Sequence, residues 1–187
     1  MPLLQTRADA SAWGYGFLGA TASTGNFYLI QQLSSSAVSA VTFSSIPSTY
    51  KSLQLRFNLV VSYGGGAYLP LTLNGDNGAN YVFHSVGTNG STSGAYGSTS
   101  QNWIGLFQGA GNTVNTYPAV GIVDLIDYSN TGKYKVAKAF IGTNGNTTYQ
   151  EIALFSGAWL STAAVTSLTL SSNPGTYTGT VSLYGVS

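Results

Sequence analysis

The chain has no cysteine and few ionisable side chains. Its 187 residues include six Lys or Arg and five Asp or Glu, so charged residues make up 6% of the sequence, where an ordinary soluble domain carries about 25%. The lack of cysteine excludes disulfides, thiolate nucleophiles and Cys-containing zinc sites. Catalysis, metal binding and nucleic-acid binding all draw on ionisable groups. The composition therefore argues against an enzyme and favours a protein that acts through shape and hydrogen-bonding surface.

Long apolar runs and a recognisable secretion signal are also missing. No window approaches the ~18 apolar residues of a membrane helix, and the start, MPLLQTRADASAWGYGF, lacks a basic segment followed by a continuous apolar stretch. The basic residues are scattered and the net charge is +1, whereas duplex binding needs Lys and Arg clustered on phosphates. We therefore expect neither a membrane nor a nucleic acid as partner.

Short segments with the period-two alternation of half-buried strands dominate the sequence. Segments rich in Val, Ile, Leu, Phe, Tyr and Thr recur at 27–33, 38–43, 53–61, 68–73, 81–86, 103–107, 120–126, 134–141, 151–159, 165–170 and 181–186. Turn clusters rich in Gly, Asn and Ser separate them. The uncharged segment 87–100 is expected to be a long exposed loop. The pattern predicts an all-β domain over 27–187, an antiparallel, jelly-roll-like β-sandwich of about 8–10 strands.

Residues 1–26 differ from the rest of the chain. They interleave Gly, Ala and Ser with Trp13, Tyr15 and Phe17, show little alternation, and contain too much Gly for a helix. Such a segment cannot bury its aromatic side chains by folding on itself. We interpret it as an extended N-terminal arm whose three aromatic residues bind another surface. A neighbouring subunit is the first candidate for that surface, and the chain's own sandwich is the alternative.

No catalytic constellation stands out. His84 is the single histidine, and no G-x-S-x-G elbow accompanies it, so it is expected to be a strand-end residue making one hydrogen bond. Asp124 and Asp127 are the one close pair of carboxylates, but a separation of three places them on opposite faces of a strand. Asp127 also begins a turn-like DYSNTGK segment. We therefore assign no catalytic residue.

The segment NGDNGAN at 74–80 is similar to a calcium-binding loop in composition. Calcium takes six to eight oxygen ligands, usually with several carboxylates, and here Asp76 stands alone. A strand-connecting turn is the favoured interpretation, with a weak ion site as the alternative. We assign no metal and no cofactor.

Tyrosine and lysine provide the remaining candidates. Seven tyrosines lie in or near predicted loops, where rigid rings suit protein interfaces and glycan stacking: Tyr63, Tyr68, Tyr96, Tyr117, Tyr128, Tyr149 and Tyr177. Ordinary half-buried sheet tyrosines are the alternative. The lysines Lys133, Lys135 and Lys138 form the one basic cluster and are expected on a solvated edge strand that they protect from pairing.

Four ordered segments resemble a family of structural proteins from tailed-phage virions. They are VTFSSIPSTYKSLQLRFN at 41–58, LTLNGDNGANYVFH at 71–84, VDLIDYSNTGKYKVAKAF at 123–140 and VSLYGVS at 181–187. The start QTRADASAWGYGFLGA is similar to leader segments of such proteins. The resemblance implies a β-sandwich with a structural or adhesive role and no catalytic residues. Members serve as capsid decoration (cement) proteins or within tail fibres.

Two features of the sequence favour the capsid over the tail. A short arm precedes the predicted sandwich, and no heptads or repeats typical of a fibre shaft occur. We therefore expect a non-enzymatic capsid decoration protein on the outer surface of the virion. Its partners would be the major capsid protein and copies of itself, as a homotrimer. A tail-fibre or receptor- and carbohydrate-binding module is the alternative.

Overall fold

A computed structural model describes residues 26–62, 68–108, 118–143 and 151–187 of the chain. These ranges form twelve strands, and no helix among them is long and apolar enough to cross a membrane. The strands are β1 (Phe27–Val38), β2 (Ala40–Phe43), β3 (Ser52–Ser62), β4 (Tyr68–Leu73), β5 (Tyr81–Thr88), β6 (Ser93–Gln101), β7 (Ile104–Gln108), β8 (Ala119–Ile126), β9 (Lys135–Thr143), β10 (Glu151–Trp159), β11 (Leu168–Ser171) and β12 (Thr176–Val186). The predicted arm, with Trp13, Tyr15 and Phe17, lies outside the described residues.

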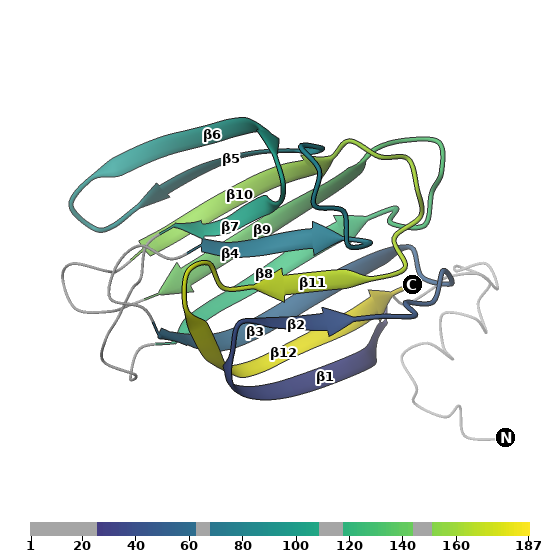
Figure 1. Ribbon diagram of the computed structural model, residues 1–187, viewed down its shortest axis with the longest axis horizontal. Coiled ribbons are helices and arrows are strands. Elements are labelled where there is room, and N and C mark those ends of the chain that lie inside the picture. Colours follow the sequence, from purple (N-terminus) through teal and green to yellow (C-terminus); the bar gives the residue numbers. More distant parts are fainter. Residues whose placement is uncertain (1–25, 63–67, 109–117, 144–150) are drawn as a thin grey trace, which may run out of the picture.

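The strands form two antiparallel sheets that pack face to face (Figure 1). The large sheet has the order β1-β12-β3-β8-β9-β10-β5-β6, and the small sheet has the order β2-β11-β4-β7. This arrangement confirms the predicted β-sandwich, and the jelly-roll connectivity stays a prediction. Strands β8 and β9 lie at the middle of the large sheet, with three further strands on either side of this pair.

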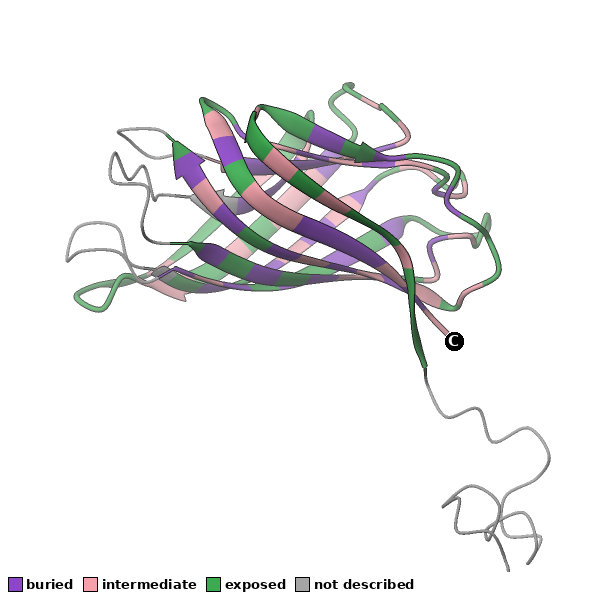
Figure 2. Ribbon diagram, turned by 90° about the horizontal axis from the view of Figure 1, so that it is seen from below, coloured by how far each residue is buried: buried purple, intermediate pink, exposed green. Residues whose placement is uncertain are grey.

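The core fills the space between the sheets, as the alternation requires. On β3 the side chains of Leu53, Leu55, Phe57, Leu59 and Val61 are all buried, while their neighbours along the strand are half-buried or exposed. Figure 2 shows the same banding of buried and exposed residues along the strands. Burial of apolar surface contributes about 25 cal/mol per Å². The period of two therefore decides which face of each strand turns inward.

Large rings in the core lie directly against glycine on a neighbouring strand. Phe57 on β3 is paired with Gly121 on β8, and a Cβ atom at Gly121 would lie 2.2 Å from the Phe57 ring. Gly185 on β12 likewise lies under Tyr50, where a Cβ would be 2.3 Å from the ring. Each ring therefore fits only because the glycine beneath it has no side chain.

The exposed loop predicted at 87–100 is instead most of a hairpin formed by β5 and β6, two strands that pair from Tyr81↔Gln101 to Thr88↔Ser93. Its turn is held by Asn89, whose Oδ1 accepts hydrogen bonds from the backbone N–H groups of Ser91 (3.0 Å) and Thr92 (2.8 Å). Gly90 follows with a φ of 87°, which glycine adopts without strain. Backbone hydrogen bonds to β5 hold this segment as a strand, although its small polar side chains do not predict one.

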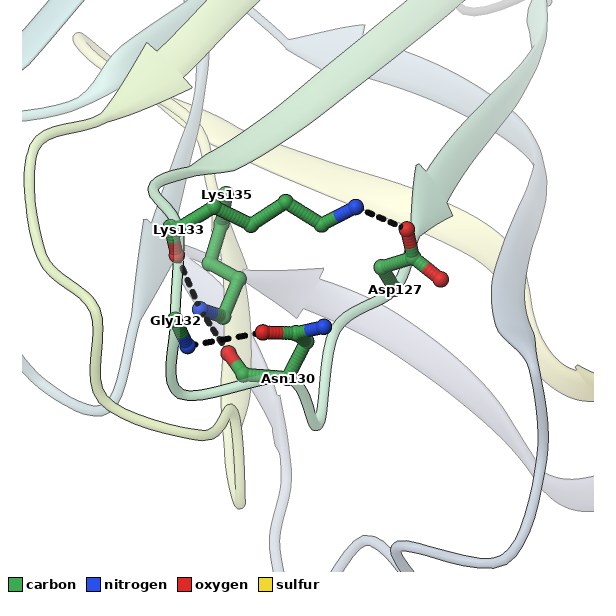
Figure 3. Close-up of polar contacts among 5 residues, drawn as sticks. All are labelled: Asp127, Asn130, Gly132, Lys133 and Lys135. Atoms are coloured by element: carbon green, nitrogen blue, oxygen red, sulfur yellow. Dashed lines mark hydrogen bonds and ion pairs between the residues drawn. The ribbon is translucent and has the colours of Figure 1, made fainter.

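The predicted lysine-guarded edge strand is wrong, because β9 lies between β8 and β10 in the centre of the large sheet. Lys135 points inward and is fully buried. Its Nζ donates to the carbonyl oxygens of Asn130 (2.5 Å), Lys133 (2.8 Å) and Thr162 (3.2 Å). Figure 3 shows how the loop before β9 folds over this ammonium group, with Lys133 turned away to pair with Asp127.

Candidate functional site

The most distinctive surface of the protein is the outer face of the large sheet, on the side away from the small sheet. Four large apolar side chains near its centre are about half exposed: Val86 (54%), Ile122 (43%), Phe140 (50%) and Leu154 (56%). Single exposed apolar residues are common on soluble proteins. A contiguous group of them marks an interaction surface more often than chance.

Strand register makes these four residues one continuous group. Ile122 on β8 is paired with Phe140 on β9, Phe140 with Leu154 on β10, and Leu154 with Val86 on β5. Directly paired side chains on one face are about 5 Å apart. The four therefore form an uninterrupted line across four strands, which we call the apolar row.

A line of polar side chains runs parallel to the apolar row, one step further along the same face. It is built by the pairings of β3, β8, β9, β10 and β5. We call it the polar row: Gln54, Asp124, Lys138, Ser156 and His84.

Hydrogen bonds order one end of the polar row. Gln54 Nε2 donates to Asp124 Oδ1 (2.8 Å), and Arg56 Nε donates to Gln54 Oε1 (2.6 Å). The Arg56 guanidinium lies over the rings of Phe27 (4.7 Å) and Tyr184 (4.6 Å), where cation–π attraction holds it. Although Asp124 and Lys138 are paired across strands, no ion pair joins them among the described residues. Both charges on the polar row are thus available to a partner.

A second apolar line borders the polar row on its other side. It consists of Ile126, Val136, Ala158 and Val82, linked by pairings of β8, β9, β10 and β5, and we call it the small apolar row. Ile126 and Val136 are 53% and 43% exposed. The outer face therefore has a polar centre line between two apolar margins.

A hollow of about 780 Å³ lies between the apolar row and the polar row. Its walls are the side chains of both rows, and its floor is the backbone of the residues between them, such as Ala139 and Phe155. Tyr96, which is 56% exposed on β6, stands at its far end. The volume lies in the range of ligand sites, but most of the surface that lines it is apolar.

The predicted catalytic candidates do not come together. His84 and Asp124 are in the same row but on strands three positions apart, which separates them by about 14 Å. Ser156 is paired with His84, yet no hydrogen bond joins their side chains. His84 lies in the middle of β5 rather than at its end, and it makes no hydrogen bond with a described residue, so that prediction was wrong. Asp127 lies in the turn after β8 with a φ of 52°.

Asp76 serves a structural purpose, in agreement with the predicted turn. Its carboxylate accepts hydrogen bonds from Trp159 Nε1 (2.6 Å), Gly78 N (2.8 Å) and Asn80 Nδ2 (2.9 Å). These donors, led by Trp159, hold the pKa of the carboxyl below its ordinary value of 3.8. Within the described ranges no three His, Asp or Glu side chains are grouped so that they could hold a metal ion.

The loop tyrosines divide into two groups. Tyr128 and Tyr177 are fully buried, so neither is available for an interface or a glycan. Their hydroxyl groups donate to the carbonyl oxygens of Pro47 and Leu170, respectively. Tyr96 is exposed, and the ring of Tyr68 packs at a tilt of 45° against Trp103, with ring centroids 5.3 Å apart. Tyr63, Tyr117 and Tyr149 lie outside the described residues.

Sequence reasoning missed the outer face, although the sequence carries a signal for it. The segment AVGIVDLI at β8 and the segment EIALFSGAW at β10 place apolar residues on both faces of their strands. Runs of this kind are typical of strands covered on both sides. The small sheet covers the inner side of these strands. The apolar residues on the outer side therefore point to a second contact surface.

The fold and this surface define a class: a small all-β sandwich with one apolar sheet face that no described part of the chain covers. No protein-family model, curated protein or solved structure compared with the chain matches it.

Proposed function

We propose that the protein is a non-enzymatic structural component of a tailed-phage virion, a capsid decoration protein that stabilises the shell by binding neighbouring subunits. The observation that carries the proposal is the outer face of the large sheet, with its polar row between two apolar margins. A surface of this kind suits contact with another protein, because apolar rows bury area while few charges lose water. The resemblance of four segments to virion proteins supplies the setting.

The mode of action is thermodynamic. A protein that binds the assembled shell and not its dissociated subunits stabilises the shell by mass action. Such a role needs a rigid body with a docking surface and no reactive groups. The separation of His84 from Asp124 and the structural use of Asp76 are in keeping with it.

The test is the position of the protein on the particle. Antibodies against the purified chain, visualised by immunogold electron microscopy on virions of the phage that encodes it, should label the whole head. Label confined to the tail would replace the proposal with the tail-fibre alternative. Unlabelled particles that still infect would refute a virion role.

A variant pair tests whether the outer face is used. Leu154→Glu places a charge in the apolar row, while Leu160→Glu changes a leucine of similar exposure (56% and 42%) beyond the end of β10. We expect Leu154→Glu to reduce the copies incorporated per virion at least about tenfold, the effect of losing ~1.4 kcal/mol of binding. Leu160→Glu should be incorporated normally. Equal incorporation of both variants would exclude this face from the contact.

A receptor- or carbohydrate-binding module of the tail is the second candidate, and one observation favours it. The ring of Tyr96 is exposed on β6, at the edge of the large sheet, and rigid aromatic rings are common sugar platforms. Binding of the purified chain to a glycan array, removed by Tyr96→Ala and retained by Tyr68→Ala, would support this function.

A further inference from the structure

The outer face is large enough to be a complete interface. Six strands from β3 to β6 contribute to it, and strands about 4.8 Å apart with residues about 3.3 Å long give a patch of about 29 by 26 Å for eight-residue strands. This is roughly 750 Å² on one molecule, close to the ~800 Å² per partner of a standard stable interface. A partner that covered it would need a surface of similar size and matching pattern.

The distribution of charge on this face is complementary to itself. Asp124 on β8 and Lys138 on β9 occupy adjacent positions in the polar row, on either side of the midline of the eight-stranded sheet. A two-fold axis along the strands at this midline exchanges β8 with β9. It therefore places Asp124 of one copy opposite Lys138 of the other, and the reciprocal pair forms at the same time.

The same rotation matches the apolar residues of the two central strands, while it places Leu154 on β10 opposite Arg56 on β3. It places Ile122 opposite Phe140 of the second copy in the apolar row, and Ile126 opposite Val136 in the small apolar row, because each of these pairs spans β8 and β9. One step beyond the apolar row, Val120 of one copy lies opposite Gly142 of the other, so a large side chain faces a residue without one.

We propose that the outer face of the large sheet is the contact surface of a two-fold dimer of this chain. The inference rests on the proposed function's claim that this face docks on protein, and it deepens that function by identifying the neighbouring subunit that docks there as a second copy of the chain. A face-to-face contact of this kind closes with two copies. It therefore departs from the homotrimer expected from the sequence.

Charge exchange tests the pairing in the purified full-length chain. Sedimentation velocity should show a wild-type dimer with a dissociation constant of about micromolar or tighter. Asp124→Lys and Lys138→Asp each bring like charges together twice per dimer, and each should weaken association at least about tenfold. The double variant restores opposite charges and should return to within about threefold of wild type. Lys51→Asp, an exposed lysine off the outer face, is the control with the same change of charge.

Cross-linking gives a second readout that does not depend on the charged residues. Because the chain has no cysteine, Val136→Cys provides a single thiol close to the proposed axis, and a short bismaleimide should convert this variant to a covalent dimer. Thr42→Cys, on the exposed side of the small sheet, should stay uncoupled.

A wild-type monomer or trimer, a dimer unaffected by both single charge variants, or equal cross-linking at both cysteines would each overturn the dimer. None of these measurements involves virions. If the purified chain does not dimerise but immunogold labels the capsid, the proposed function stands and the dimer is refuted. If the chain dimerises but the capsid is not labelled, the virion role is refuted and the dimer stands.

Discussion

At the scale of single residues, several of the few charged side chains hold turns in place. Lys135 donates hydrogen bonds to three backbone carbonyl oxygens that would otherwise lack this donor. Burial lowers the pKa of its ammonium group from the ordinary value of 10.5, with the nearby Lys133 as a smaller cause. A lysine in this position acts as a three-way clamp and not as a solubilising surface charge.

Replacing this clamp should destabilise the fold. Lys135→Met keeps most of the side-chain volume but leaves the carbonyls of Asn130, Lys133 and Thr162 without a donor. We expect a loss of about 2 kcal/mol in the free energy of unfolding, measured by urea titration. Lys51→Met removes an exposed lysine and should change stability by less than about 0.5 kcal/mol. Equal effects of the two variants would contradict the clamp.

Asp76 predicts how stability depends on acid. Its pKa is lower in the folded protein than in the unfolded chain, where the ordinary value is 3.8. The contribution of the ionised carboxylate is therefore complete above about pH 4 and is lost as the pH falls toward the lower folded-state pKa. Asp76→Asn should cost about 1–2 kcal/mol at neutral pH.

The same variant should also make stability less sensitive to pH below about pH 4. Urea titrations at several pH values measure both effects. Asp127→Asn, which removes an exposed ion pair with Lys133, is the matched control and should cost less than about 1 kcal/mol. If Asp76→Asn left the loss of stability at acid pH unchanged, other carboxyl groups would be responsible for that loss.

At the scale of elements, neighbouring strands pack closely where a ring meets glycine. Gly121→Ala on β8 would drive a methyl group into the Phe57 ring. We expect it to destabilise the protein by about 1–3 kcal/mol, because a packed core resists an added carbon. Gly142→Ala on the adjacent strand β9 meets no atom within 4 Å and should be nearly neutral. A thermal unfolding comparison that ranks the two variants equally would contradict this account.

At the scale of the whole molecule, buried tyrosines on strands of the large sheet hydrogen-bond to main chain of, or just after, strands of the small sheet. Burial raises the pKa of Tyr81 and of Tyr177 to about 12, from an ordinary value of 10.0. Their hydroxyl groups donate to main-chain carbonyls, of Asp76 (3.0 Å) for Tyr81 and of Leu170 (2.8 Å) for Tyr177. Deprotonation would leave a buried phenolate facing each carbonyl oxygen.

Alkaline pH should therefore weaken the fold over a defined window. Because the folded pKa values are raised, the stabilisation is complete below about pH 10 and is lost as the pH rises toward about 12. The near-ultraviolet absorbance of tyrosinate should report the ionisation of Tyr81 and Tyr177 within this window. Tyr177→Phe should reduce the slope of stability against pH in this window. An unchanged slope would show that Tyr177 does not titrate with unfolding.

The sequence alone was enough to predict the strand-rich class, the approximate positions of most strands and the turn at Asp76. It did not reveal that Lys135 is buried, that Tyr128 and Tyr177 lie inside, or that 93–101 is a strand. Each of these depends on which strands become neighbours. The Asn89–Gly90 pair did carry a local turn signal for the missed hairpin.

The sequence by itself determined that the chain folds into a β-sandwich and which side of a strand such as β3 turns inward. Alternation is a property of adjacent residues, and burial of the apolar side follows directly from it. The tertiary structure decided that β8 and β9 are central and that residues far apart in the chain form the apolar row and the polar row. Such rows arise only from the register of strands that pair over long separations, and no local pattern specifies that register.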